Sequence, residues 1–268
     1  MLEFVNLSKK KFSQISLSDS CKAILLGSLL GDGSLKIYKP YKNARFWIRH
    51  SISQKDYYNW KIKELKEIST KKSNQLQKPS GYSQKEKFLF QSAAKEQLTE
   101  IYNIIYRKNR LRIRRKWLNF LTPLSLAIWW LDDGSIIDNG RRGVFCTDGF
   151  SKKEHEVLKR YFYVVWKIEV HIGVLKRFYN GQHKNYFRLY LKNTSLKKLF
   201  RIIMPHIPIS GYLMSSMLYK FCLLYKNTEL QERWISEMVF GFPNCKENVI
   251  RETIQLRKTQ LKNFQKMI

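Results

Sequence analysis

The chain has 268 residues, 44% of them hydrophobic, and its 50 lysines and arginines against 21 acidic residues give a formal net charge of +29. This length is enough for one or two domains with a substantial core. So large a positive charge favours nucleic acid as the partner, and no apolar run reaches the roughly 20 residues needed to cross a membrane.

The first part of the chain predicts a helix followed by a β-hairpin. Ser18 or Asp19 can cap a helix that runs to about Leu30. Two alternating runs, at 34–38 and 44–50, then predict the hairpin. The segments that follow predict a helix at 54–68, a strand at 87–93 and a helix at 95–108.

The second part of the chain repeats this order. A cap at Thr122, followed by Pro123 at the first helical position, predicts a helix that ends at Asp133. The remaining segments predict a hairpin at Asn139-Gly140, a helix at 151–168, a second hairpin at Asn180-Gly181, and a helix at 194–207 that is broken at Pro205.

Two basic segments have more than one interpretation. The run RKNRLRIRRK at 107–116 is either a solvated linker or a phosphate-contacting segment between two halves, and we favour the second interpretation. The last two predicted helices either brace the second half or add contacts to nucleic acid. The predicted division is a first repeat at 1–106, a linker at 107–117, a second repeat at 118–220 and a helical extension at 221–268.

The most informative pattern is an internal repeat. LLGSLLGDGS at 25–34 and LAIWWLDDGS at 126–135 both end in an acid, a glycine and a serine, and Asp32 and Asp133 lie 101 residues apart. We expect two helices that pack along these runs, each stopped by a glycine at C′. Two carboxylates that meet at helix C-termini repel each other unless cations lie between them, which indicates a divalent metal site.

Small residues in the first of these helices complement bulky residues in the second. Gly27 and Gly31 leave a bare stripe on one helical face, whereas the second helix carries Ile128, Trp129 and Trp130. Glycine inside a helix costs about 1 kcal/mol relative to alanine, so a close helix–helix approach is the expected compensation. This asymmetry favours a pseudo-twofold monomer over a homodimer.

Both runs resemble the LAGLIDADG motif of homing endonucleases, in the two-motif, single-chain form of that family. The resemblance implies an α+β fold: a pseudo-twofold monomer of two αββαββα repeats, with antiparallel DNA-binding saddles and the two motif helices packed at the centre. It also implies an intron-encoded, site-specific endonuclease that makes a double-strand break in a long asymmetric DNA target.

The resemblance assigns catalysis and metal binding to Asp32 and Asp133, each serving one strand. The main-chain carbonyls of Gly31 and Asp132 are expected as additional ligands, and the side chain of Asp132 is expected to be a solvated or capping acid. Mg²⁺, with Mn²⁺ as a substitute, suits oxygen ligands and phosphodiester hydrolysis.

Related endonucleases also place a polar hairpin residue and a basic residue near the attacking water of each half. Motif alignment puts His50 and Asp148 at the hairpin positions, where many relatives have glutamine, and a plain ribbon role for His50 is equally open. Lys220 is the basic candidate of the second half. Lys108 or Arg110 is the basic candidate of the first.

DNA recognition is expected from polar and aromatic residues of the hairpins and from the basic linker. The candidates are Lys36, Tyr38, Arg45, Trp47, Arg49, Arg114, Arg115, Arg141, Arg142, Lys176, Arg177 and Arg188. The alternative function is an RNA-binding group I intron maturase of the same fold, with intron RNA as its partner. The presence of both acids favours cleavage.

The expected location is an organelle, a mitochondrion or a chloroplast, in which the protein is also encoded. The first residues, MLEFVNLSKKKF, do not favour a secretory signal or a transit peptide. The four cysteines form no CxxC pair, so free thiols rather than a zinc site are expected.

Overall fold

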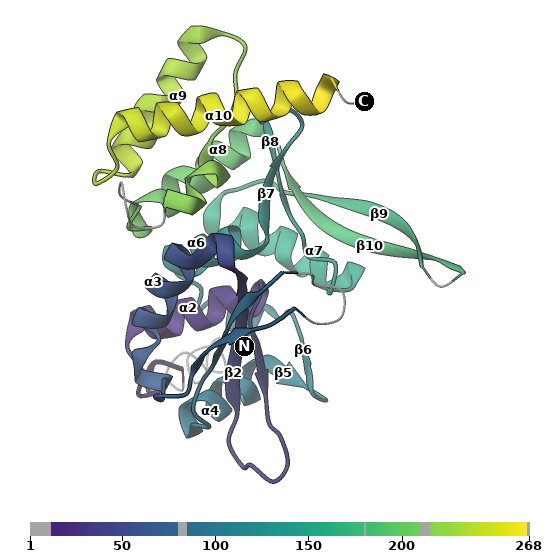
Figure 1. Ribbon diagram of the computed structural model, residues 1–268. Helices are drawn as coiled ribbons and strands as arrows, with labels where there is room; N and C mark the ends of the chain where they lie inside the picture. The colour runs from purple at the N-terminus through teal and green to yellow at the C-terminus, as the bar shows by residue number, and fades with distance from the viewer. Residues whose placement is uncertain (1–11, 80–84, 180, 210–214, 267–268) are drawn as a thin grey trace.

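The computed structural model describes residues 12–79, 85–179, 181–209 and 215–266, so the predicted turn residue Asn180 lies outside the described part. Two repeats with the same order of elements form most of it (Figure 1). The first repeat consists of α2 (Asp19–Leu30), β1 (Ser34–Lys36), β2 (Arg45–Ser51), α3 (Lys55–Glu64), β3 (Asn74–Gln77), β4 (Lys87–Gln91) and α4 (Glu96–Ile105). The second consists of α6 (Pro123–Asp133), β7 (Gly134–Ile137), β8 (Arg142–Phe145), α7 (Lys152–Tyr161), β9 (His171–Tyr179), β10 (Gln182–Leu191) and α8 (Asn193–Ile203).

Each repeat contains one four-stranded antiparallel sheet. The strand orders are β1-β2-β4-β3 and β7-β8-β10-β9, so equivalent strands occupy the same places in the two sheets. The predicted α+β fold of two αββαββα repeats is therefore confirmed. The strand β3 was not predicted, because its sequence NQLQ has no apolar alternation.

Short helical turns complete several of these elements. They are η1 (Ile52–Gln54), η2 (Lys66–Ile68), the π-helical turn η3 (Phe162–Trp166) and η4 (Met204–His206). The predicted helix at 151–168 is thus an α-helix that ends at Tyr161 and continues as a π-helical turn.

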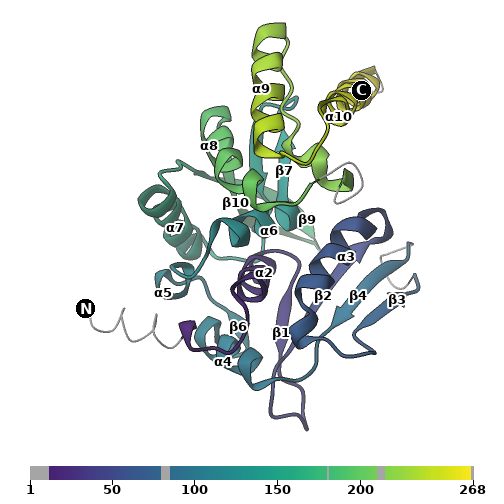
Figure 2. The same cartoon turned by 90° about the vertical axis from the view of Figure 1, so that its left-hand side faces the viewer.

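The motif helices α2 and α6 pack on each other at the centre of the molecule (Figure 2). A Cβ atom on Gly27 would lie 2.4 Å from the carbonyl oxygen of Ser125 and 2.7 Å from Cβ of Ile128. Gly31 faces Asp132 in the same way, with a distance of 2.5 Å to Cβ. The predicted glycine stripe is therefore the surface through which α2 approaches α6.

The two tryptophans of α6 do not fill that stripe. The Trp129 and Trp130 rings lie 4.4 and 5.3 Å from the ring of Phe145, inside the core of their own repeat. Of the three bulky residues predicted to face the glycines, only Ile128 does so.

The glycines after the two acids are needed for space rather than for backbone conformation. As predicted, α6 ends just past its aspartate at Gly134, whereas α2 already ends before its aspartate, with Gly31 as its C-cap. Neither Gly33 nor Gly134 has the left-handed conformation of a C′ residue. A Cβ atom on Gly33 would lie 2.8 Å from the carbonyl oxygen of Ser28, and one on Gly134 would lie 2.2 Å from the ring of Trp130.

Equivalent positions of the two repeats are separated by a fixed number of residues, the offset, which changes at the first hairpin. Ser34 pairs with Trp47 and Ser135 pairs with Val144, so the offset is 101 residues before the turn and 97 after it. The next helices keep the second offset, since α3 and α7 begin 97 residues apart. Three buried positions match at this offset: Tyr57 with Glu154, Tyr58 with His155, and Lys61 with Leu158.

The basic segment between the repeats has its own structure. It forms a small antiparallel pair, β5 (Tyr106–Arg107) and β6 (Arg110–Leu111), and the short helix α5 (Arg115–Leu118). The turn between the strands uses positive φ angles of 50° at Lys108 and 59° at Asn109.

The C-terminal extension covers the second repeat. After η5 (Ser215–Phe221) come α9 (Thr228–Gly241) and α10 (Glu247–Lys266), which Figure 1 shows stacked beyond α8 and the tip of the β7–β8 hairpin. Trp234, Met238 and Phe242 are fully buried in this contact. No helix in the described ranges is long and apolar enough to cross a membrane.

Candidate active site

The two predicted acids lie at the ends of the packed helices α2 and α6. Asp32 follows the last turn of α2, and Asp133 is the last residue of α6. Burial, and then the charge of Asp132, raise the pKa of Asp32 to about 6. Burial, and then the charge of Asp32, raise the pKa of Asp133 to about 8. The fold therefore brings carboxylates close enough to oppose each other's ionisation.

Asp132 is a buried ion-pair partner, and the prediction of a solvated or capping acid is wrong. Its side chain is 0% exposed, and its two carboxylate oxygens accept hydrogen bonds from Lys61 Nζ at 2.8 and 2.9 Å. The hydroxyl of Tyr57 donates a third hydrogen bond, at 2.7 Å. Because Lys61 and Tyr57 lie on α3, this cluster joins the first repeat to the motif helix of the second.

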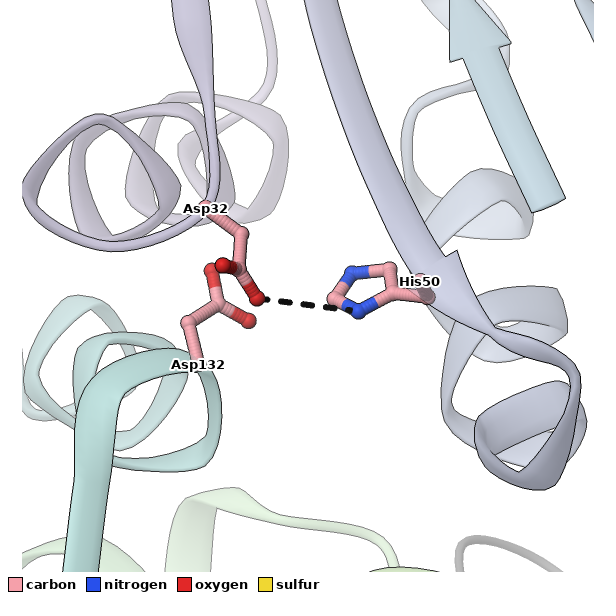
Figure 3. Close-up of side chains that lie close together, drawn as sticks. All are labelled: Asp32, His50 and Asp132. Atoms are coloured by element: carbon pink, nitrogen blue, oxygen red, sulfur yellow. Dashed lines mark ion pairs between the residues drawn. The ribbon is translucent and has the colours of Figure 1, made fainter. Parts of the chain in front are cut away.

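His50 lies in the active site rather than on the open face of the hairpin. Strand β2 alternates, so Phe46, Ile48 and His50 point inward to the helices. His50 Nδ1 lies 3.9 Å from Asp32 Oδ2 and has no hydrogen-bond partner in the described part of the chain (Figure 3). Burial, and then the charge of Lys61, lower the pKa of His50 to about 4, so its ring is neutral near pH 7.

Three side chains form a cluster with the geometry of a metal site. Ligand atoms of Asp32, His50 and Asp132 all lie within 4.8 Å of one another (Figure 3). A cation here would neutralise the carboxylates whose mutual repulsion raises the pKa of Asp32. The predicted main-chain ligand Gly31 lies against Asp132, and its carbonyl role stays a prediction.

Lys220 holds the end of α6. It is carried by η5, and its Nζ donates to the carbonyl oxygens of Leu131 at 2.5 Å, Gly134 at 3.0 Å and Asp132 at 3.4 Å. These carbonyl groups have no partner inside the helix, so the ammonium caps them. The Asp132 carbonyl, a predicted metal ligand, is thus one of its acceptors.

Asp148 is not the counterpart of His50. The strand register places Thr147 at that position, and Thr147 Oγ1 lies 2.8 Å from His155 Nε2. Asp148 instead accepts two hydrogen bonds from Arg188, at 2.5 and 2.7 Å. These bonds lower the pKa of Asp148. They also engage Arg188, which was predicted to contact DNA.

The predicted basic residues of the linker lie away from the acids. Lys108 is exposed in the turn between β5 and β6, and Arg110 donates to the carbonyl oxygen of Gly149. The lysines that lower the pKa of Asp32 are Lys61, Lys220 and Lys87, which makes these three the basic groups nearest to that acid in effect.

Two arginines of the linker serve the fold. Arg114 is half-buried and donates to the carbonyl oxygen of Ile104. The guanidinium of Arg115 bonds Asn119 and lies 5.1 Å from the ring centroid of Tyr161. Both guanidinium groups thus make contacts within the protein, and their contacts to DNA stay a prediction.

The other predicted DNA-binding residues lie on the open faces and turns of the sheets. In β2, the outward positions alternate with the buried ones and are occupied by Arg45, Trp47 and Arg49. The exposed members of the set are Lys36, Tyr38, Arg49, Arg141, Arg142, Lys176 and Arg177.

Lys61 and Tyr57 were not found from the sequence. The segment KDYYNWKIKE has a dense mixture of charged and aromatic residues, so its lysines look solvent-exposed. The signal that does exist is spacing: positions 57, 58 and 61 repeat the buried positions 154, 155 and 158 of the second repeat.

Comparison with known proteins agrees with this geometry. The profile of the LAGLIDADG DNA endonuclease family matches residues 22–199. The chain belongs to this family, as the resemblance of the two motifs predicted.

Among curated proteins, the chain is 26% identical over 209 residues to the cytochrome b mRNA maturase bI2 of Saccharomyces cerevisiae, which covers 74% of this chain and 46% of that protein. It is 33% identical over 122 residues to Protein RecA of Mycobacterium gastri, covering 44% of this chain and 27% of that protein. The chain therefore spans less than half the length of these relatives.

Among solved structures, the homing endonuclease I-WcaI bound to its DNA recognition sequence is similar, with a TM-score of 0.63 and 21% identity. The match covers 82% of this chain and 92% of that one. It supports the fold described above.

Proposed function

We propose that this protein is a site-specific DNA endonuclease that makes a double-strand break in a long asymmetric target and so promotes intron mobility. The observation that carries the proposal is the placement of Asp32 and Asp133 at the ends of two packed helices, where burial, and then the charge of Asp32, raise the pKa of Asp133, between two sheets with basic outer faces. Such a centre lies where two strands of one duplex could both be reached. An organelle as the place of action belongs to the same proposal.

The donor set fits Mg²⁺, with Mn²⁺ as a substitute. Asp32 and Asp133 offer carboxylate oxygens, which these ions prefer. Both oxygens of Asp132 are already engaged by Lys61. When bound, the cation would supply water activation and charge stabilisation at the phosphate.

The residues of the chain have separate tasks in this proposal. Asp32 and Asp133 would hold the cation, one acid from each repeat. Lys220 fixes the main chain around Asp133 by capping three carbonyl groups. The aromatic and basic outer residues of the sheets hold the duplex, through phosphate contacts that set register and side-chain contacts that read bases.

The test is cleavage of the DNA junction that lacks the intron, in Mg²⁺ and in Ca²⁺. Asp32→Asn and Asp133→Asn should each abolish the double-strand break while DNA binding at moderate salt is retained. Tight, specific binding without cleavage by the wild type would contradict the endonuclease.

A maturase function is the second candidate because of one comparison. The relative that covers the most of this chain among those above is a maturase of cytochrome b mRNA. An RNA-binding maturase would promote splicing of its own intron in vitro, and this activity would survive Asp32→Asn because splicing does not use the acid pair.

A further inference from the structure

Lys61 occupies a position that the fold fills with an apolar side chain in the other repeat. Lys61 is fully buried in α3, and the equivalent residue of α7 is Leu158, which is also fully buried. Burying an ammonium and its partner is often less favourable than burying apolar residues of similar volume. The architecture therefore does not require a charge at this position.

The contacts of Lys61 lead to the reaction centre. Its Nζ donates to both oxygens of Asp132 and lies 3.4 Å from His50 Nε2. An ammonium group can only donate, so Nε2 is the acceptor and the ring proton of His50 is on Nδ1. Nδ1 is the atom that faces Asp32, at 3.9 Å, and it has no other partner among the described residues.

We propose that Lys61 is a positioning residue of the Asp32 centre: it fixes the Nδ1–H tautomer of His50 and aims that donor at an oxygen bound beside Asp32. This oxygen belongs to the solvent or to the phosphate that reacts there. The proposal rests on the endonuclease function and adds an assignment that the motifs do not contain.

The second repeat has no equivalent of the contact between Lys61 and His50. Thr147 and His155 bond each other where the first repeat has His50 and Tyr58, and Leu158 stands in place of Lys61. The two centres are therefore unequal, and the removal of Lys61 should affect one DNA strand.

The test variant removes both charges of the buried pair. Lys61→Leu introduces the residue of the second repeat, and Asp132→Asn is added because a lone buried carboxylate would destabilise the fold by itself. The control variant, Arg201→Leu with Glu237→Gln, removes an ion pair at 2.8 Å between α8 and α9. Urea unfolding checks that each protein is folded.

The first readout is independent of DNA. Nuclear magnetic resonance of ¹⁵N-histidine protein, with His50 assigned from His50→Gln, reports which ring nitrogen carries the proton. We expect the Nδ1–H form in the wild type and in the control, and loss of its dominance in the double variant. An unchanged Nδ1–H form in the double variant would overturn the proposal, even if the wild type cuts no DNA.

The second readout follows each DNA strand with its own end label. The strand that depends on Asp32 is the one that Asp32→Asn slows more. We expect the double variant to slow that strand on the order of 100-fold, as misplacement of a catalytic group does, and the other strand by less than about twofold. Equal slowing of both strands, with lower stability in urea, would show a purely structural pair and would reject the proposal.

Discussion

The carboxyl group of Asp133 couples the stability of the protein to pH. Its pKa is about 8 in the folded chain because of burial and the neighbouring acids, whereas an unfolded aspartate titrates near 4. Between these values the folded state binds the proton more tightly than the unfolded state. This contribution to stability is fully present below a pH of about 4 and is lost as the pH rises through 8.

Asp133→Asn should therefore stabilise the metal-free protein increasingly as the pH rises above about 4. We expect the variant to exceed the wild type in free energy of unfolding on the order of 2 kcal/mol at a pH of about 9, and to match it at a pH of about 4. Urea titrations at both pH values measure this. Added Mg²⁺ should narrow the difference by stabilising the wild type. An equal difference at both pH values would contradict the assigned cause.

At the residue scale, the sequence revealed the acids but not their surroundings. Asp32 and Asp133 could be found because two copies of one motif have the same phase. Lys61 could not, because a lysine in a charged helix looks exposed, and its match to the buried Leu158 depends on an offset of 97 residues that only the strand register gives. Asp148, which was aligned with His50, lies one residue beyond the equivalent position, Thr147, because the strand register sets the offset at 97 residues after the shorter turn of the second hairpin.

The contact between α2 and α6 leaves no room for a side chain at Gly27. Gly27→Ala improves helix propensity by about 1 kcal/mol, but its methyl group would lie 2.4 Å from Ser125 O and 2.7 Å from Ile128 Cβ. We expect a net loss of about 1–3 kcal/mol from overpacking, measured as urea stability. Gly149→Ala is the control, because a Cβ atom there meets nothing within 4 Å. Similar stability of the two variants would refute the close contact.

The β9–β10 hairpin is long (Figure 1) and carries Lys176 and Arg177, two exposed residues that are predicted to contact DNA. Replacing Lys176 and Arg177 by glutamine should weaken binding of specific and unrelated duplexes alike and lower the slope of log affinity against log salt by about two, about one per phosphate contact. The exposed residues Lys198 and Lys226, replaced in the same way, are the control. An unchanged slope in the hairpin variant would remove β9–β10 from the DNA interface.

At the element scale, periodicity predicted most helices and strands because their buried faces are apolar. The helices α2, α4, α6 and α8 lie within two or three residues of their predicted ranges, apart from the 3₁₀ turn at Pro205. In the segment 107–116, the strand pair β5–β6 was not predicted because the sequence is highly charged. Arginines of this pair donate hydrogen bonds to main-chain carbonyl groups. Composition indicates which ligand a segment would attract, but not which groups its side chains contact within the fold.

The C-terminal extension stabilises the second repeat. Trp234 of α9 is fully buried, lies 5.9 Å from the ring of Phe200, and donates its indole N–H to the carbonyl oxygen of Phe221 at 3.0 Å. This favours a brace over the alternative of extra nucleic-acid contact for α9. Through η5, the brace also supports Lys220.

Trp234→Ala should lower the free energy of unfolding by about 3–5 kcal/mol, because it leaves a large cavity beside the second repeat. Phe240→Ala on the same helix is the control: its side chain is 89% exposed, so we expect a change within about 0.5 kcal/mol. Calorimetry or urea unfolding measures both. The salt dependence of DNA binding should not change in either variant if α9 does not contact DNA.

The contact between α2 and α6 is asymmetric, and this asymmetry determines which partner each half of the chain can bind when it is expressed alone. Two copies of the first half would set Gly27 opposite Gly27 and leave a void. Two copies of the second half would set Ile128 against itself and bring Asp132 within reach of its own twin, without a lysine from α3 between them. When the two halves are expressed as separate fragments, neither should form a homodimer, and together they should form a one-to-one heterodimer. The two motif helices have thus diverged so far that neither half of the duplicated chain can form a homodimer through this contact.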